Sequence, residues 1–326
     1  MSQTDLTETI SDNPFLNDLL TGLRQTQKSV PPRWFYDETG SELFEKITEL
    51  DAYYPSRVET QILRENAAMI SLHLGPEVTL VEYGAGASVK ARILLSALDR
   101  PRTYIPIDIS ADFVKQSAAA INRDFPNLEV RPVIGDFTQD VDIDFLPGFR
   151  QGGFFPGSTI GNLDDAAIDT FFTRARALLG PEATFVLGYD LVKDPDILIR
   201  AYDDEDGVTA AFNKNLLVRA NRELGADFDP EKFDHEARWN DQDQRVEMHL
   251  VSTETQTVTI GDWHIPILAD ESIHTENSRK FVTSAFDQRL LKTGWTVETT
   301  LTDENELFAV ALMRATGDDP DCADNS

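Results

Sequence analysis

Apolar residues recur in short runs through the middle of the chain, and each run ends in a glycine-rich or acidic segment. The first run, Val78–Val81, is apolar except for Thr79, which indicates a strand buried on both faces of a parallel sheet. Glu82 ends it, and Gly84 and Gly86 follow in a turn that lets the backbone pass close to a ligand. Ser88 is placed to cap a helix with an apolar face. This order predicts the first unit of a doubly wound α/β domain, whose ligands bind at that crevice.

Two further predicted strands lead into acidic residues. Thr103–Ile107 is followed by Asp108, about 20 residues after the glycine turn, the usual interval for a ribose-binding acid. The next predicted strand, Val130–Ile134, is followed by Asp136 and Phe137. A nucleoside suits this pattern, because one carboxylate binds the ribose hydroxyls, another the adenine amino group, and the aromatic ring covers the base. Val89 stands where a pyrophosphate-binding GxGxxG has its third glycine, which favours S-adenosylmethionine over NAD.

The second half of the chain predicts an interruption of this domain. After Lys193 the pattern changes to a helix from about 208 to 224, then to hairpin-like alternation over 245–267 and a helix-like turn at 276–278. Two closing strands, Trp295–Leu301 and Leu307–Met313, are expected to complete the sheet with an antiparallel edge. We therefore expect a nucleoside-binding domain of residues 59–192 plus 282–316, a second α+β domain of residues 1–58 plus 193–281, and a disordered tail at 317–326.

Charge and composition exclude several classes of function. The chain has 29 Lys and Arg against 57 Asp and Glu, a formal charge of −28, so it repels nucleic acids and anionic membranes. Its N-terminus lacks the basic and apolar regions of a signal peptide. The single cysteine, Cys322, and five histidines without HxH or HExxH spacing predict no metal site. We expect a cytoplasmic monomer with a small-molecule substrate.

Two segments remain to be explained. Residues 29–57 are dense in aromatics, which either fill a core or wall a small-molecule pocket. Residues 157–162 form a polar turn after a predicted strand, at the same edge of the sheet as the glycine turn. Asn162 in this turn is either an ordinary helix cap or a ligand-binding group.

Longer strings resemble a known family: PPRWFYDETGSELFEKIT, YYPSR, GSTIGNL, DLVKD, RAYDD, GVTAAFN and ENSRKF. They are similar to the S-adenosylmethionine-dependent histidine N-alpha-methyltransferases of ergothioneine biosynthesis, over about residues 29–314. The resemblance implies a class I methyltransferase-like Rossmann sheet and a second, histidine-binding domain. It also implies transfer of three methyl groups to the α-amino group of L-histidine, giving hercynine and S-adenosylhomocysteine.

The resemblance also implies roles for single residues. The chemistry of the transfer, which needs a deprotonated and oriented amine, makes Tyr36 a candidate base or proton relay and the side-chain carbonyl of Asn162 a candidate for orienting the amine. The cofactor-binding positions of the family match Gly84, Lys90, Asp108, Asp136 and Phe137, and the glycine turn adds Gly86 as a cofactor-binding candidate. Tyr53, Asn162 and Tyr202 match positions that hold the amine and carboxylate of histidine, Glu276 and Ser278 match those that bind its imidazole, and Phe44 and Met248, with Tyr36, line the pocket.

The chain departs from the family pattern in places, and alternatives stay open. GAGASVK replaces a turn that usually reads more like GSGTSEK, so Ala85 and Ala87 remove hydroxyls. Pro156 stands where an aliphatic residue is usual, and His249 where an aromatic is usual, which bears on the shape of the pocket. The alternatives are a nicotinamide-dependent oxidoreductase, a non-catalytic nucleoside- or partner-binding protein, and an N-methyltransferase of another amino acid such as tryptophan.

Overall fold

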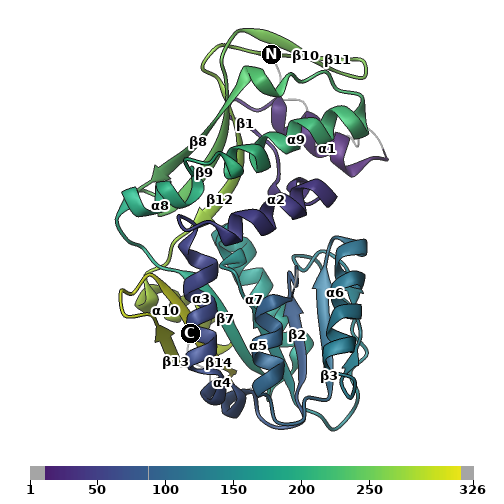
Figure 1. Cartoon of the computed structure of the whole chain (residues 1–326), viewed down its shortest axis with the longest axis vertical. Helices are drawn as coiled ribbons and strands as arrows, with labels where there is room; N and C mark the ends of the chain where they lie inside the picture. The colour runs from purple at the N-terminus through teal and green to yellow at the C-terminus, as the bar shows by residue number, and fades with distance from the viewer. Residues whose placement is uncertain (1–11, 87, 317–326) are drawn as a thin grey trace, which may run out of the picture. The chain divides into compact units, whose positions relative to one another are not determined.

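The computed structural model describes residues 12–86 and 88–316, and the chain forms two compact units (Figure 1). Unit 1 comprises residues up to Tyr53 and Asp194–Ser278, and unit 2 comprises Tyr54–Lys193 and the residues from Arg279. The expected tail at 317–326, with Cys322, and Ala87 lie outside the described residues.

The junctions differ from the expected ones by a few residues. Residues 54–58, expected in the second domain, open helix α3 (Tyr54–Glu65) of unit 2. Residues 279–281 also belong to unit 2, since Phe281 N donates to Asp190 O at 2.9 Å and Val192 N to Phe281 O at 3.1 Å.

Unit 2 is built on a mixed sheet with a parallel centre. Its strand order is β13-β14-β7-β6-β2-β3-β4, and β5 also pairs with β3. The strands from β7 to β4 run parallel, whereas β14 pairs antiparallel with β7 and β13 antiparallel with β14. The bounds are β2 (Thr79–Tyr83), β3 (Thr103–Asp108), β4 (Glu129–Val130), β5 (Val133–Ile134), β6 (Gln151–Phe155), β7 (Thr184–Asp190), β13 (Trp295–Thr302) and β14 (Phe308–Ala315).

Helices cover both faces of this sheet. One face packs against α7 (Asp165–Leu179) and α10 (Thr283–Lys292) through a core rich in aromatic side chains, among them Phe155, Phe171 and Trp295. On the other side lie α3, α4 (Ala67–Leu74) and α5 (Val89–Ala97), and α6 (Ala111–Asp124) packs on β3. A short 3-10 turn, η2 (Thr159–Asn162), follows β6. The doubly wound sheet with an antiparallel closing pair agrees with the fold class predicted from the sequence.

Two local predictions for unit 2 need correction, and one of the two roles left open for Asn162 is excluded. Ser88 precedes α5 with a left-handed φ of 53° and makes no capping bond. Its hydroxyl lies 2.9 Å from Tyr104 Oη instead, so burial with a polar partner outweighs capping. The strand expected up to Ile134 is split into β4 and β5, which pair with different parts of β3. Asn162 does not cap α7, because Asp164 Oδ1 accepts from Ala167 N at 2.8 Å.

Unit 1 combines a small sheet with helices. The sheet has the order β1-β12-β9-β8, and β10 and β11 form a separate hairpin. Ser278, expected in a helix-like turn, lies in a strand, because β12 pairs alongside β9. The strands are β1 (Lys28–Ser29), β8 (Phe233–Asn240), β9 (Arg245–Ser252), β10 (Gln256–Ile260), β11 (Trp263–Ile267) and β12 (Ser272–Arg279).

Helix α9 (Val208–Leu224) is the central helix of unit 1. It packs on α2 (Glu38–Glu49), on 3-10 helix η1 (Pro32–Phe35) and on β8 and β9. α1 (Pro14–Leu23), α8 (Pro195–Tyr202) and the 3-10 turn η3 (Pro230–Lys232) complete the unit. Among residues 12–86 and 88–316, no helix has both the length and the apolar character needed to cross a membrane.

Candidate active site

The glycine turn of unit 2 is held directly by the end of β3. Gly84 N donates to Ile107 O at 3.0 Å, and Gly86 N donates to Asp108 Oδ2 at 3.0 Å. Gly84 and Gly86 have φ of 68° and 50°, values that favour glycine. Asp108 Oδ1 accepts from Ser110 N at 2.9 Å, so both carboxylate oxygens have a backbone donor and retain lone pairs for a ligand. Burial raises the pKa of Asp108, and these backbone donors oppose the rise.

The end of β5 adjoins the same turn. Gly135 N donates to Asp108 O at 3.0 Å, and Asp136 Oδ1 accepts from Thr138 N at 2.9 Å. A Cβ at Gly84 would lie 3.5 Å from the Phe137 ring, which itself packs edge-on against the core. The expected cofactor residues from three strand ends therefore lie together in unit 2.

Lys90, the remaining expected cofactor residue, is already paired with an acid that the sequence reasoning missed. Its ammonium, on α5, forms an ion pair with Glu59 of α3. Glu59 is fully buried and accepts from Gly157 N at 2.8 Å. A Cβ at Gly188 would overlap Glu59 Oε1, so glycine is needed there for this close approach. The available signal was an acidic residue on the apolar face of α3, which also carries Ile62 and Leu63.

A buried polar chain runs beneath the glycine turn. Tyr104 Oη donates to Glu82 Oε2, Ser88 Oγ lies 2.9 Å from Tyr104 Oη, and Ser117 Oγ donates to Ser88 Oγ at 2.7 Å. Burial raises the pKa of Glu82 to about 8, which the Tyr104 hydrogen bond opposes. The strand end next to the candidate cofactor site is therefore held by a chain of buried hydrogen bonds.

Asn162 ends the η2 turn at the carboxyl end of β6, the same edge as the glycine turn. The turn is anchored on both sides. Ser158 Oγ accepts from Asp190 N at 3.0 Å, and a Cβ at Gly161 would lie 2.8 Å from Arg279 O. The backbone around Asn162 is thus fixed by close contacts within unit 2.

The candidate substrate residues of unit 1 form a row of aromatic side chains. The ring of Tyr36 lies edge-on to Phe44 with centroids 5.8 Å apart, Phe44 lies 6.4 Å from Tyr53, and Tyr53 lies 5.8 Å from Tyr202. Tyr202 Oη lies 2.7 Å from Ser278 Oγ. Segments far apart in the sequence therefore supply one continuous set of aromatic and hydroxyl groups.

Phe212 belongs to the same row, although the sequence reasoning did not single it out. Its ring lies 5.9 Å from Tyr36 and 6.0 Å from Phe44. It is the phenylalanine of the string GVTAAFN, so the signal was present. It fixes the rings of the two pocket candidates against α9.

The other two candidates lie on neighbouring strands of unit 1. Met248 is buried in β9, and its carbonyl accepts from Thr275 Oγ1 at 3.0 Å. Glu276 is half-buried in β12, and its carbonyl accepts from His274 Nε2 at 3.0 Å. His249, noted as a departure from the family pattern, packs with its ring parallel to that of His274.

The candidates thus fall into two sets. Unit 2 holds Asn162 with the six expected cofactor residues, and unit 1 holds Tyr36 with the other expected substrate residues. The pairing of Tyr36 with Asn162 in one reaction stays a prediction.

The sheet order of unit 2, with acids and a glycine turn at the carboxyl ends of its strands, defines a class I S-adenosylmethionine-dependent methyltransferase. The family model described as "Histidine-specific methyltransferase, SAM-dependent" matches residues 15–315. The chain belongs to this family of S-adenosylmethionine-dependent, histidine-specific methyltransferases, which confirms the resemblance and sets aside the oxidoreductase and the non-catalytic binding protein.

Two curated relatives cover most of the chain. A histidine N-alpha-methyltransferase of Mycobacterium tuberculosis is 42% identical over 300 residues, which are 90% of this chain and 93% of that protein. A histidine N-alpha-methyltransferase of Mycolicibacterium smegmatis is 44% identical over 269 residues, 81% of this chain and 83% of that protein. Among solved structures, an S-adenosylmethionine-dependent methyltransferase from Clostridium acetobutylicum aligns with a TM-score of 0.48 at 12% identity, covering 86% of this chain and 98% of that one.

Proposed function

We propose that this protein transfers three methyl groups in succession from S-adenosylmethionine to the α-amino nitrogen of L-histidine, giving hercynine for ergothioneine biosynthesis. The observation that carries the proposal is the family match over residues 15–315, which includes every candidate site residue of both units. Each transfer releases one S-adenosylhomocysteine.

The reaction is a displacement at a sulfonium methyl group. The amine lone pair forms the new N–C bond while the C–S bond breaks, and its electron pair leaves with the sulfur as a neutral thioether. The nitrogen must be unprotonated and in line with the C–S bond, so most of the catalysis is positioning and exclusion of water. After the third transfer the nitrogen is quaternary and has no lone pair left to react.

Unit 2 is proposed to hold the cofactor. Asp108 accepts from the ribose hydroxyls, Asp136 from the adenine amino group, and Phe137 covers the base. Gly84 and Gly86 admit the cofactor to the backbone turn. The ammonium of Lys90 is assigned to the cofactor site by the family resemblance, and its ion pair with Glu59 fixes where that ammonium lies.

Unit 1 and Asn162 are proposed to hold histidine. Tyr53, Asn162 and Tyr202 bind its amine and carboxylate, and the Asn162 carbonyl oxygen orients the amine. Tyr202 Oη and Ser278 Oγ lie 2.7 Å apart, so each hydroxyl orients the other. This contact supports the assignment of both residues to one polar part of the histidine site. Glu276 and Ser278 accept and donate at the imidazole, and Phe44 and Met248 line the pocket.

Tyr36 is the candidate that relays the amine proton. An ordinary phenol has a pKa near 10 and is a weak base, so we assign it the passing on of the proton and not its retention. The aromatic faces of Tyr36 and Phe44, 5.8 Å apart at their centroids, also suit the quaternary ammonium of the product.

We also propose that the enzyme is a cytoplasmic monomer. Its charge of −28 favours solubility and opposes self-association by repulsion. Light scattering of the purified chain at physiological salt tests this, and a dimer mass would contradict it.

The test of the function is mass spectrometry of the products made from S-adenosylmethionine and each amino acid in turn. We expect mass gains of one, two and three methyl groups on histidine alone. Methylation of tryptophan, or of another amino acid, in preference to histidine would contradict the substrate assignment while leaving the methyltransferase class intact.

A further inference from the structure

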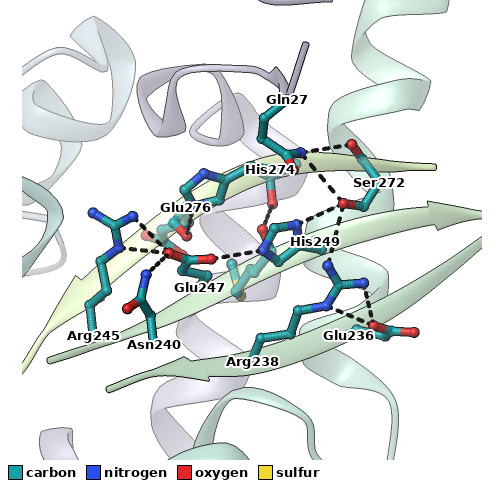
Figure 2. A network of polar contacts seen from close by, with 12 residues as sticks. Gln27, Glu236, Arg238, Asn240, Arg245, Glu247, His249, Ser272, His274 and Glu276 are labelled. Atoms are coloured by element: carbon teal, nitrogen blue, oxygen red, sulfur yellow. Dashed lines mark hydrogen bonds and ion pairs between the residues drawn. The ribbon is translucent and has the colours of Figure 1, made fainter. Parts of the chain in front are cut away.

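Three side chains from two neighbouring strands of unit 1 converge on the polar face of its sheet (Figure 2). Glu247 and His249 lie on β9 and His274 lies on β12. Each offers one ligand atom, and these atoms all lie within 4.8 Å of one another. The rings of His249 and His274 are stacked, with centroids 4.9 Å apart and planes at 16°.

Strand geometry explains why they meet. Glu247 and His249 are two residues apart on one strand, so both side chains point to the same face, and Met248 between them points to the other. His274 is brought beside His249 by the pairing of β12 with β9. The sequence reasoning excluded a metal site because no HxH or HExxH spacing occurs, but it did not consider a Glu-x-His pair joined by a histidine from another strand.

Polar contacts on both oxygens orient the carboxylate of Glu247. Its Oε1 accepts from Arg245 Nε at 2.8 Å and from Asn240 Nδ2 at 2.9 Å. Its Oε2 lies 3.2 Å from His249 Nε2. That separation is close to the ~3.3 Å expected between two ligands of a tetrahedral Zn²⁺ ion with bonds of about 2.0–2.1 Å.

Both histidines also have a partner on their second ring nitrogen. His249 Nδ1 lies 3.2 Å from Ser272 Oγ. His274 Nε2 lies 3.0 Å from Glu276 O, a carbonyl that can only accept, so the neutral ring keeps its lone pair on Nδ1. A hydrogen bond at the second nitrogen is the usual way in which proteins orient a metal-binding histidine.

The donor types suit a transition-metal ion. Imidazole nitrogens and a carboxylate oxygen are common protein ligands of such ions, and they bind as the neutral imidazole and the ionised carboxylate.

We propose that Glu247, His249 and His274 bind one divalent transition-metal ion of the borderline class that Zn²⁺ represents. Two imidazole nitrogens and one carboxylate oxygen favour such ions over Mg²⁺ or Ca²⁺, which prefer oxygen ligands. Three protein ligands leave the fourth position for water or another small ligand. On binding, His249 gives Nε2 to the metal and carries its proton on Nδ1, where it donates to Ser272 Oγ.

The test is titration of the purified full-length chain with Zn²⁺ in competition with a chromogenic chelator. We expect one equivalent to bind tightly, above any weak binding to the many surface carboxylates. His249→Phe and His274→Gln should each weaken this equivalent at least about 10-fold, and Ser272→Ala should weaken it about 10–100-fold through His249. His264→Gln is the matched control, since His264 is exposed on β11 in the same unit and should leave the affinity unchanged.

X-ray absorption at the zinc edge, measured on the unaltered chain with one equivalent of Zn²⁺, keeps the proposal testable if the variants fold poorly. A first shell with two imidazoles supports the site. Absence of a tight equivalent, unchanged affinity in folded His249→Phe and His274→Gln, or a first shell without imidazole would each overturn it. None of these readouts depends on methyl transfer, so they stand apart from the proposed function.

Discussion

Lys280 Nζ lies 2.8 Å from Asp190 Oδ2, and both side chains are fully buried in unit 2. Asp190 Oδ1 also accepts from Lys193 Nζ at 2.6 Å, and Tyr54 Oη donates to the same carboxylate at 2.7 Å. Over residues 12–86 and 88–316, the chain passes between the units three times. Tyr54 is the first residue of unit 2 after the first passage, Lys193 is the last before the second, and Lys280 is the second residue after the third. One buried carboxylate therefore fixes the unit 2 side of every such passage within the described residues.

The first prediction concerns this carboxylate. Asp190→Asn should lower the free energy of unfolding by about 3–5 kcal/mol, because it leaves buried lysines without a counter-charge. Urea unfolding followed by circular dichroism measures this. Asp169→Asn, which alters an exposed pair with Arg289, is the control and should cost less than about 1 kcal/mol. Adding Lys280→Met to Asp190→Asn should recover part of the loss, and equal effects of the two aspartate changes would contradict the assignment.

The second prediction concerns the cofactor. Asp108→Ala should weaken binding of S-adenosylhomocysteine, since about two charge-assisted hydrogen bonds worth roughly 1.5–3 kcal/mol each are lost. Isothermal titration measures the affinity. Asp112→Ala, an exposed acid in the first turn of α6, is the matched control. If Asp108→Ala binds S-adenosylhomocysteine as tightly as that control, the ribose is held elsewhere.

The third prediction is a pH dependence of stability. The pKa of Glu82 is about 8 in the folded chain against 4.5 for the ordinary group. Between these values the unfolded chain ionises Glu82 and the folded chain does not, so this group lowers the free energy of unfolding as pH rises. Glu82→Gln removes that contribution.

The free energy of unfolding of Glu82→Gln, minus that of the unaltered chain, should therefore rise from pH 5 to pH 7. This difference can change by at most about 1.4 kcal/mol per pH unit. Urea unfolding at pH 5, 6 and 7 measures it, with the exposed Glu65→Gln as control. A gap that stays constant with pH would show that Glu82 is ionised in the folded chain.

The fourth prediction concerns substrate choice. Glu276→Ala should weaken histidine binding by about 2 kcal/mol or more, roughly 30-fold, because the imidazole N–H loses its acceptor. Affinity for S-adenosylmethionine should barely change. Titration of histidine in the presence of S-adenosylhomocysteine measures this without turnover. Glu254→Ala, at an exposed pair with Lys232, is the control. Unchanged kcat/KM for histidine in Glu276→Ala would remove the physical basis of this assignment.

Local sequence patterns are enough to predict the sheet of unit 2 and its cofactor edge. Short, mainly apolar runs bounded by turn residues, such as Val78–Val81, favour buried strands, and glycines and acids directly after such strands lie where parallel strands end. In each case strand, turn and acid lie within a few residues of each other. For the same reason the pattern alone groups Gly84, Asp108, Asp136 and Phe137 at one edge of the sheet.

The contacts between distant segments follow from the three-dimensional packing and not from any local pattern. The ion pair of Lys90 with Glu59 depends on the packing of α5 against α3. His274 lies near Glu247 and His249 because β12 pairs with β9. Ser88 looks like a helix cap in the sequence, yet its hydroxyl bonds Tyr104, because a buried hydroxyl without a partner costs more free energy than a lost cap. Local pattern fixes which face of an element is buried, whereas long-range packing selects the partners of each buried polar group.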